Sequence, residues 1–154
     1  MGIARRIVQA RVAGRAFTGE GARRYGGRWN SNGVAVVYTA GSTSLAILEV
    51  LVHIPTYDIL DEYVHIPVEF DNKFVLALNP DELPAKWDKD PSPHANKQIG
   101  DSWVGNQRSL ILELPSVIVP TEKNFLINPA HPDFSKLKIG EPQRFEFDPR
   151  RLKF

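Results

Sequence analysis

The sequence predicts one compact α+β domain over residues 1–154, with mixed β-sheets and few short helices. A length of 154 residues with 42% hydrophobic content suits a single core. Short apolar runs bounded by turn formers are mixed with few helix-like stretches. No internal repeat, low-complexity tract or long linker divides the chain. One domain is therefore the simplest organisation.

The first clear elements are a strand followed by a helix. Residues 34–40, VAVVYTA, form a β-rich run between turn formers, which predicts a strand. Residues 43–53, TSLAILEVLVH, follow Gly-Ser and have candidate N-caps at Ser42, Thr43 or Ser44. Apolar residues occupy every side of this segment, so we expect a short, buried helix.

The middle of the chain predicts two strands and a long loop. Residues 61–70, DEYVHIPVEF, alternate as a strand does, and residues 73–79, KFVLALN, continue the sheet. Residues 79–96 are dense in Pro, Asp and Asn, which oppose regular structure. We expect this stretch to be an excursion within the same domain.

The last third predicts a helix and further strands. A helix is expected through residues 96–107, although two glycines weaken it. Residues 109–119, SLILELPSVIV, are β-rich but interrupted by Pro115, which indicates an edge, a bend or two short strands. The tail 143–154 alternates Phe145 and Phe147 with charged residues, as a terminal strand would.

Composition excludes several classes of protein. The chain has no Cys, so it has neither disulfides nor a thiolate nucleophile or metal ligand, and a reducing compartment, the cytoplasm, is expected. There is no signal-peptide pattern and no run of ~18 apolar residues, so we expect no membrane span. The four His residues lack metal-binding spacing, and no metal is expected.

Positive charge is concentrated at the N-terminus. Residues 1–30 hold seven Arg against one acidic residue, which leaves 12 basic and 17 acidic groups in the remainder. Guanidinium groups pair bidentately with phosphate oxygens, so the block suits a phosphate-bearing ligand. It would equally suit a partner-facing or solvated surface.

A different class of function makes the arginine-rich N-terminus the nucleic-acid-binding face of a non-enzymatic module. The net charge of +1 and the lack of aromatic residues interleaved with the basic run argue against it. We therefore expect no direct nucleic-acid binding. Filter binding across a salt series tests for nucleic-acid binding, because phosphate-driven binding falls steeply with salt.

Glu49 is the most informative single residue, because its seven companions in LAILEVLV (45–52) are all apolar. A carboxylate in such surroundings costs several kcal/mol unless it is compensated. Either Glu49 pairs with an N-terminal Arg and fixes the packing, or it is a functional carboxylate. We favour the functional interpretation.

Two further residues are candidates for a ligand site. Arg28 follows Gly26 and Gly27 in RRYGGRWN, where missing side chains allow a ligand or another backbone to come close. Tyr38 ends a strand just before a turn, from which its ring can line a cleft and stack on a flat heterocycle. An ordinary turn and an ordinary core tyrosine are the alternatives. Walker, GxGxxG and GxSxG motifs are absent.

These segments together resemble a known family. GEGARRYGGRWNSNGVAVVYTA, then SLAILEVLVH, then GDSWVGNQRSLILELPSVIVPTEKNFLINPAHPDF resemble the RES domain, which is named for an Arg, a Glu and a Ser and is similar to ADP-ribosyltransferase toxins. The family's Arg, Tyr and Glu correspond to Arg28, Tyr38 and Glu49. Its Ser corresponds to Ser109 or Ser116, and we favour Ser116 because Pro115 would turn its hydroxyl toward a cleft.

The resemblance implies an ADP-ribosyltransferase-like fold and a growth-inhibiting toxin that attacks NAD at the nicotinamide-ribose bond. Glu49 would stabilise the oxocarbenium-like centre, Arg28 would hold the pyrophosphate, Tyr38 would stack on nicotinamide, and a Ser hydroxyl, from Ser116 or Ser109, would bind near the ribose or carboxamide. The acceptor stays open between water, phosphate and a protein side chain, the last making the chain an ADP-ribosyltransferase. The resemblance further implies an Xre-type antitoxin partner with a helix-turn-helix domain.

Overall fold

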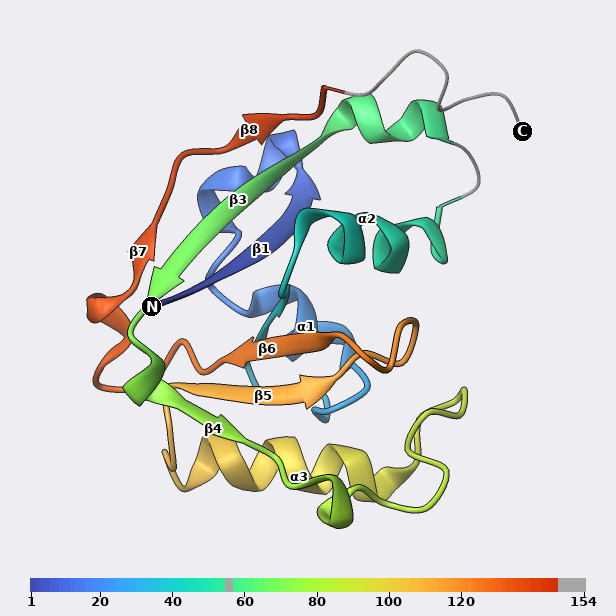
Figure 1. Ribbon diagram of the computed structural model, residues 1–154, viewed down its shortest axis with the longest axis vertical. Helices are drawn as coiled ribbons and strands as arrows, with labels where there is room; N and C mark the ends of the chain where they lie inside the picture. Colours follow the sequence, from blue (N-terminus) through green and yellow to red (C-terminus); the bar gives the residue numbers. More distant parts are fainter. Residues whose placement is uncertain (55–56, 147–154) are drawn as a thin grey trace.

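A computed structural model describes residues 1–54 and 57–146. In these residues one eight-stranded sheet has the order β4-β5-β6-β2-β1-β3-β7, and β8 also pairs with β3. The sheet is strongly curled, so that β4, β5 and β6 lie well apart from β3 at its other end (Figure 1). The strands are β1 Gly2–Gln9, β2 Val37–Ala40, β3 Tyr63–Phe70, β4 Val75–Ala77, β5 Ile111–Pro115, β6 Lys123–Ile127, β7 Lys138–Ile139 and β8 Gln143–Arg144.

Three α-helices accompany the sheet. They are α1 Glu20–Tyr25, α2 Thr43–Leu51 and α3 His94–Gly105, with 3-10 turns at Ala10–Arg15, Tyr57–Glu62, Asn72–Phe74, Pro80–Glu82 and Phe134–Lys136. Helix α3 lies below the β4–β5 end of the sheet, while α2 lies beside β1 (Figure 1). Strand pairing is antiparallel except between β4 and β5. The predicted α+β class is confirmed.

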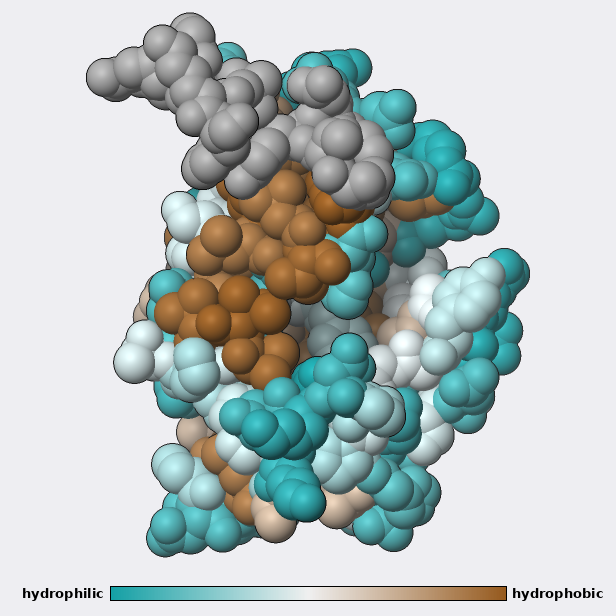
Figure 2. All heavy atoms as spheres, turned by 90° about the vertical axis from the view of Figure 1, so that its right-hand side faces the viewer, coloured by the Kyte–Doolittle hydropathy of each residue, from teal (hydrophilic) through white to brown (hydrophobic). Residues whose placement is uncertain are grey.

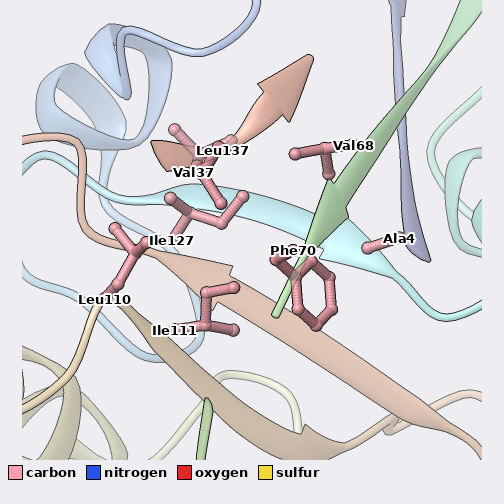
Figure 3. Packing of buried hydrophobic residues seen from close by; sticks show 8 residues of the cluster. All are labelled: Ala4, Val37, Val68, Phe70, Leu110, Ile111, Ile127 and Leu137. Carbon is pink, nitrogen blue, oxygen red and sulfur yellow. The ribbon is translucent and has the colours of Figure 1, made fainter. Parts of the chain in front are cut away.

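The strands β5 and β6 are buried on both faces. Ile111 and Ile127 pack into one core, which Figure 3 shows between the two arms of the curled sheet. Leu112 and Leu126 point to the opposite face and pack with Trp103 of α3. Because successive strand residues face opposite sides, burial of both faces explains why SLILEL is almost uniformly apolar.

The predicted helix after Gly41 is confirmed, and its burial is corrected. Ser42 caps α2 by accepting a hydrogen bond from the backbone N–H of Leu45 at 3.1 Å. Leu45 is fully buried, but Leu48 is 45% exposed and Val52, just after the helix, is 55% exposed. Apolar residues on every side therefore do not bury α2, because only one face packs on the sheet.

Other predicted boundaries move by a few residues. The strand expected at 34–40 begins only at Val37, and the helix expected at 96–107 begins at His94. Gly100 lies inside that helix because α3 packs directly on the backbone of Trp29, whose carbonyl oxygen would be 1.6 Å from a Cβ at position 100. The glycine that weakens the helix prediction thus permits the helix to dock.

Strands near residues 61–70 and 73–79 are confirmed as β3 and β4, and residues 79–96 contain no strand. The β-rich segment at 109–119 is one strand that ends at Pro115, followed by a turn. Within the described part of the tail, 143–146, Gln143–Arg144 forms a short strand, and Phe147 lies outside the described residues. The sequence pattern predicts no element at β1 or β6.

Candidate active site

The predicted residues Arg28, Tyr38 and Glu49 line the same cleft. This cleft has a volume of about 1020 Å³. Its walls come from β1, β2, α2, the turn before Trp29, the loop at 88–92 and the turn after β5. Residues 28, 38 and 49 are thus gathered from three different parts of the fold, as a shared ligand site requires.

Glu49 lies on α2 and is held by two neutral hydrogen-bond donors. Ser116 Oγ donates to Glu49 Oε2 at 2.9 Å, and Asn124 Nδ2 donates to Glu49 Oε1 at 2.9 Å. Burial raises the pKa of Glu49 above its ordinary value, while the two hydrogen bonds oppose that rise and nearby Glu122 adds to it. Among the described residues no Arg forms an ion pair with Glu49. The alternative, in which Glu49 pairs with an N-terminal Arg and fixes the packing, is therefore not found among the described residues.

Ser116 and Ser109 occupy different environments. Ser116 has no exposed surface, and its oxygen accepts the backbone N–H groups of Ile118 and Val119 at 3.1 and 3.2 Å. Ser109 accepts from Trp103 Nε1 at 2.8 Å and donates to the carbonyl of Ile111. The structure therefore brings Ser116 to Glu49, whereas Ser109 fastens α3 to β5. Neither serine lines the cleft, so the expectation that Pro115 turns the Ser116 hydroxyl toward a cleft is corrected: the hydroxyl points to Glu49 instead.

Arg28 has one occupied edge and one open edge. Its Nη1 donates to the carbonyls of Trp87 and Lys89 at 2.9 and 2.7 Å. Within residues 1–54 and 57–146 no hydrogen bond is formed by its Nε or Nη2, and neither atom is buried. A guanidinium binds phosphate bidentately through two adjacent N–H groups, so the Nε–Nη2 edge remains available for an anion in the cleft.

Tyr38 fixes the turn that carries Arg28. Its hydroxyl donates to Asn30 Oδ1 at 2.6 Å and accepts from the backbone N–H of Trp29 at 3.0 Å. Burial raises the pKa of the Tyr38 phenol. Gly27 is required here, because a Cβ would lie 2.6 Å from the Tyr38 hydroxyl oxygen. The hydroxyl is thus used within the protein.

Several cleft residues escaped the sequence analysis. Arg6 is a half-buried arginine whose Nε and Nη1 donate to the carbonyls of Ala16 and Tyr38 at 3.0 and 3.1 Å, and desolvation lowers its pKa to about 10. Lys97 reaches the carbonyl of Gly27 at 2.9 Å. Arg6 stands beside Arg5 in the sequence, and Asn124 begins the segment NFLIN (124–128). Neither pattern identifies the partners of these side chains.

Five of the seven N-terminal arginines fall into two groups. Arg5, Arg6 and Arg28 line the cleft, whereas Arg23 and Arg24 pair with Glu20 on the exposed face of α1.

In the described part of the chain no group of three or more His, Asp or Glu residues is arranged to hold a metal ion. None of the helices within the described ranges is both long and apolar enough to cross a membrane.

Apolar side chains gather beside the cleft. Leu48, Val52 and Ile118 are exposed, and Val52 and Ile118 also line the cleft. We call these three residues the apolar rim. Figure 2 faces this side of the molecule and shows a broad hydrophobic area at the height of α2 and the turn after β5. Such patches mark interaction surfaces in soluble proteins.

Comparisons with known proteins agree with the sequence resemblance. The model of the RES domain family matches residues 3–148. A protein from Yersinia enterocolitica named Toxin Res is 43% identical over 146 residues, covering 94% of this chain and 96% of the relative. The Prs ADP-ribosylating toxin of a Sphingobium species is 39% identical over 141 residues, covering 89% and 87%.

A solved structure shares the fold. It is the toxin of the M. tuberculosis MbcT–MbcA toxin–antitoxin complex that resembles this chain, with a TM-score of 0.76 at 18% sequence identity, covering 94% of this chain and 84% of that one. At this identity the likeness concerns the fold. It confirms the predicted architecture.

Proposed function

Because the chain belongs to the RES domain family, we propose that it is a toxin that cleaves the bond between nicotinamide and ribose in NAD. The observation that carries the proposal is Glu49, a carboxylate in the cleft whose oxygens are bound by neutral donors. A charge that no cation neutralises is free to stabilise positive charge in a substrate.

Cleavage at this bond develops positive charge on the ribose C1′. The C1′–N bond breaks, its electron pair leaves with nicotinamide as a neutral molecule, and an incoming nucleophile bonds to C1′. Glu49 stabilises the oxocarbenium-like centre or holds the ribose hydroxyls. The open edge of Arg28 binds the pyrophosphate, and the ring of Tyr38 packs on the nicotinamide. Ser116 acts on the substrate through Glu49.

The acceptor is water, phosphate or a protein side chain, and the name of the Sphingobium relative, an ADP-ribosylating toxin, supports the last of these. The three reactions share the first bond cleavage and differ in the nucleophile. All of them require the carboxylate of Glu49 and the phosphate contact of Arg28, so the same cleft serves each one.

We expect the purified protein to release nicotinamide from NAD. Incubations in phosphate-free buffer, with phosphate and with cell extract, analysed by mass spectrometry, distinguish ADP-ribose, phosphorylated ADP-ribose and modified protein. Release of nicotinamide in any of the three supports the proposal. Unchanged NAD in all three after prolonged incubation overturns it.

A second component of the proposal is an antitoxin of the Xre type, with a helix-turn-helix domain, that occludes the cleft. The apolar rim gives such a partner a hydrophobic contact next to the catalytic groups. Burial of apolar side chains contributes about 25 cal/mol for each Å². The solved relative with the same fold is a toxin bound to its antitoxin.

Expression of the chain alone is expected to stop growth, and co-expression with the protein encoded beside it to restore growth. Leu48→Asp should weaken this protection while NAD consumption persists, because Leu48 is 45% exposed but does not line the cleft. Ile139→Asp is the matched control, since Ile139 is 43% exposed on β7, away from α2 (Figure 1). Normal growth with abundant folded protein contradicts the toxin proposal, and equal protection of both variants contradicts the rim as the contact.

A further inference from the structure

Asn124 contacts Glu49 from the central strand β6. Its backbone pairs with Ala40 on one side and Leu114 on the other, so the position of the side chain is set by the middle of the sheet. The amide nitrogen donates to two oxygens, Glu49 Oε1 at 2.9 Å and the Thr39 carbonyl at 3.2 Å. Both of these partners are acceptors. The side-chain amide can satisfy them only with its NH₂ group, which fixes its orientation.

The hydrogen-bond directions around Ser116 are fixed in the same way. Its oxygen accepts two backbone N–H groups, from Ile118 and Val119. A hydroxyl has two acceptor lone pairs and one proton, so the proton is the only part left for Glu49 Oε2, which lies 2.9 Å away. Ser116 therefore donates to Glu49 and cannot accept from it.

Both oxygens of Glu49 thus face groups that only donate. A carboxylate accepts from both donors in charge-assisted hydrogen bonds, and protonation of Glu49 would weaken these bonds. Hydrogen bonds to the charged form favour that form. They oppose the desolvation and the repulsion by Glu122 that raise the pKa of Glu49. Each carboxylate oxygen keeps a further lone pair for the cleft.

We propose that Asn124 is a positioning residue for Glu49, and that with Ser116 it forms a donor clamp that holds Glu49 ionised and oriented for reaction. This inference rests on the proposed NAD cleavage for its catalytic meaning, but the state of Glu49 can be observed without substrate. Asn124 acts through Glu49 by fixing its charge and direction.

Asn124→Asp and Asn124→Ala test the clamp. The aspartate is nearly isosteric and replaces a donor by a second carboxylate, so two acidic groups face each other and one of them retains a proton to higher pH. The alanine only removes the donor. In both variants Glu49 becomes harder to ionise, so NAD cleavage should fall about tenfold or more at pH 6. The loss should shrink as the pH rises, because high pH restores the carboxylate in the alanine variant.

The direct readout is a ¹³C NMR titration of the Glu49 carboxyl group in the protein without NAD. The midpoint is expected to move to higher pH in both variants relative to the unaltered protein. Asn124→Gln, which keeps the NH₂ group, should recover part of the shift. Asn106→Ala is the matched control, because the Asn106 side chain donates to the Ser102 hydroxyl at the exposed end of α3, and the substitution should change neither the titration nor the pH profile.

An unchanged Glu49 midpoint in folded Asn124→Ala, together with a pH profile that coincides with that of the unaltered protein, overturns the clamp. A uniform loss of activity at every pH with the Glu49 midpoint unchanged also overturns it, since that pattern indicates only a structural role. If the unaltered protein leaves NAD intact, the proposed reaction fails while the titration still decides whether the clamp exists.

Discussion

Replacing Glu49 with glutamine is expected to lower NAD cleavage by about 10² to 10³-fold, because the substitution removes the negative charge that stabilises the developing cation in the proposed reaction. Glutamine has nearly the same size, so the cleft should keep its shape and the loss should appear in kcat. Release of nicotinamide, followed over time with saturating NAD, measures this effect.

The stability of the same variant separates catalysis from structure. A broken buried Arg–Glu pair would destabilise the protein by about 3 to 5 kcal/mol, but Glu49 instead accepts from Ser116 and Asn124. Glutamine keeps one of these bonds and turns its own NH₂ group toward the other donor. The loss of about 1 kcal/mol for one hydrogen bond is offset by the removal of a desolvated charge.

Thermal unfolding of Glu49→Gln should therefore give a free energy of unfolding within about 1 kcal/mol of the unaltered protein. Glu82→Gln is the control, because Glu82 is exposed in the 3-10 turn Pro80–Glu82 and does not line the cleft. It should keep both stability and turnover. A loss of several kcal/mol in Glu49→Gln with near-normal turnover per folded molecule would remove Glu49 from the catalytic group.

Local signals predicted the elements that depend on neighbouring residues. The strand before Gly41 and the cap at Ser42 follow from turn formers and side-chain chemistry within a few positions. β1 was not predicted, because Arg5 and Arg6 stand side by side in it and interrupt strand-like alternation. Arg6 is tolerated only because distant carbonyls of Ala16 and Tyr38 accept its N–H groups. No local pattern in the sequence identifies Ala16 and Tyr38 as the partners of Arg6.

The candidate site shows the same limit. An acidic residue among seven apolar neighbours drew attention to Glu49, but its partners Ser116 and Asn124 are 67 and 75 positions away in sequence. Pro115 favoured Ser116 over Ser109, and β5 does end at that proline. The Ser116 hydroxyl nevertheless turns to Glu49 and leaves no surface to the cleft. Tertiary contacts determine which way a side chain points, and the local sequence pattern carries no information about those contacts.

Arg28→Ala is expected to weaken NAD binding by about 1.5 to 3 kcal/mol, or roughly tenfold to 150-fold in Kd, because it removes the proposed charged bidentate contact to phosphate. Calorimetry in the Glu49→Gln background measures binding without turnover. Arg28→Lys should recover part of the affinity, since it keeps the charge but not the paired N–H groups. Arg24→Ala is the control from the same arginine-rich segment, because Arg24 pairs with Glu20 on the surface and should leave Kd unchanged.

The two edges of the Arg28 guanidinium predict two separable losses. Nη1 holds the carbonyls of Trp87 and Lys89, so the alanine variant should also unfold at a lower temperature as the loop at 88–92 loses its attachment. The proposed phosphate contact uses Nε and Nη2, so Kd should rise for ADP-ribose and pyrophosphate as well as for NAD, while nicotinamide alone is unaffected. A folded Arg28→Ala variant that binds NAD with unaltered affinity would leave Arg28 only its structural contact to the loop.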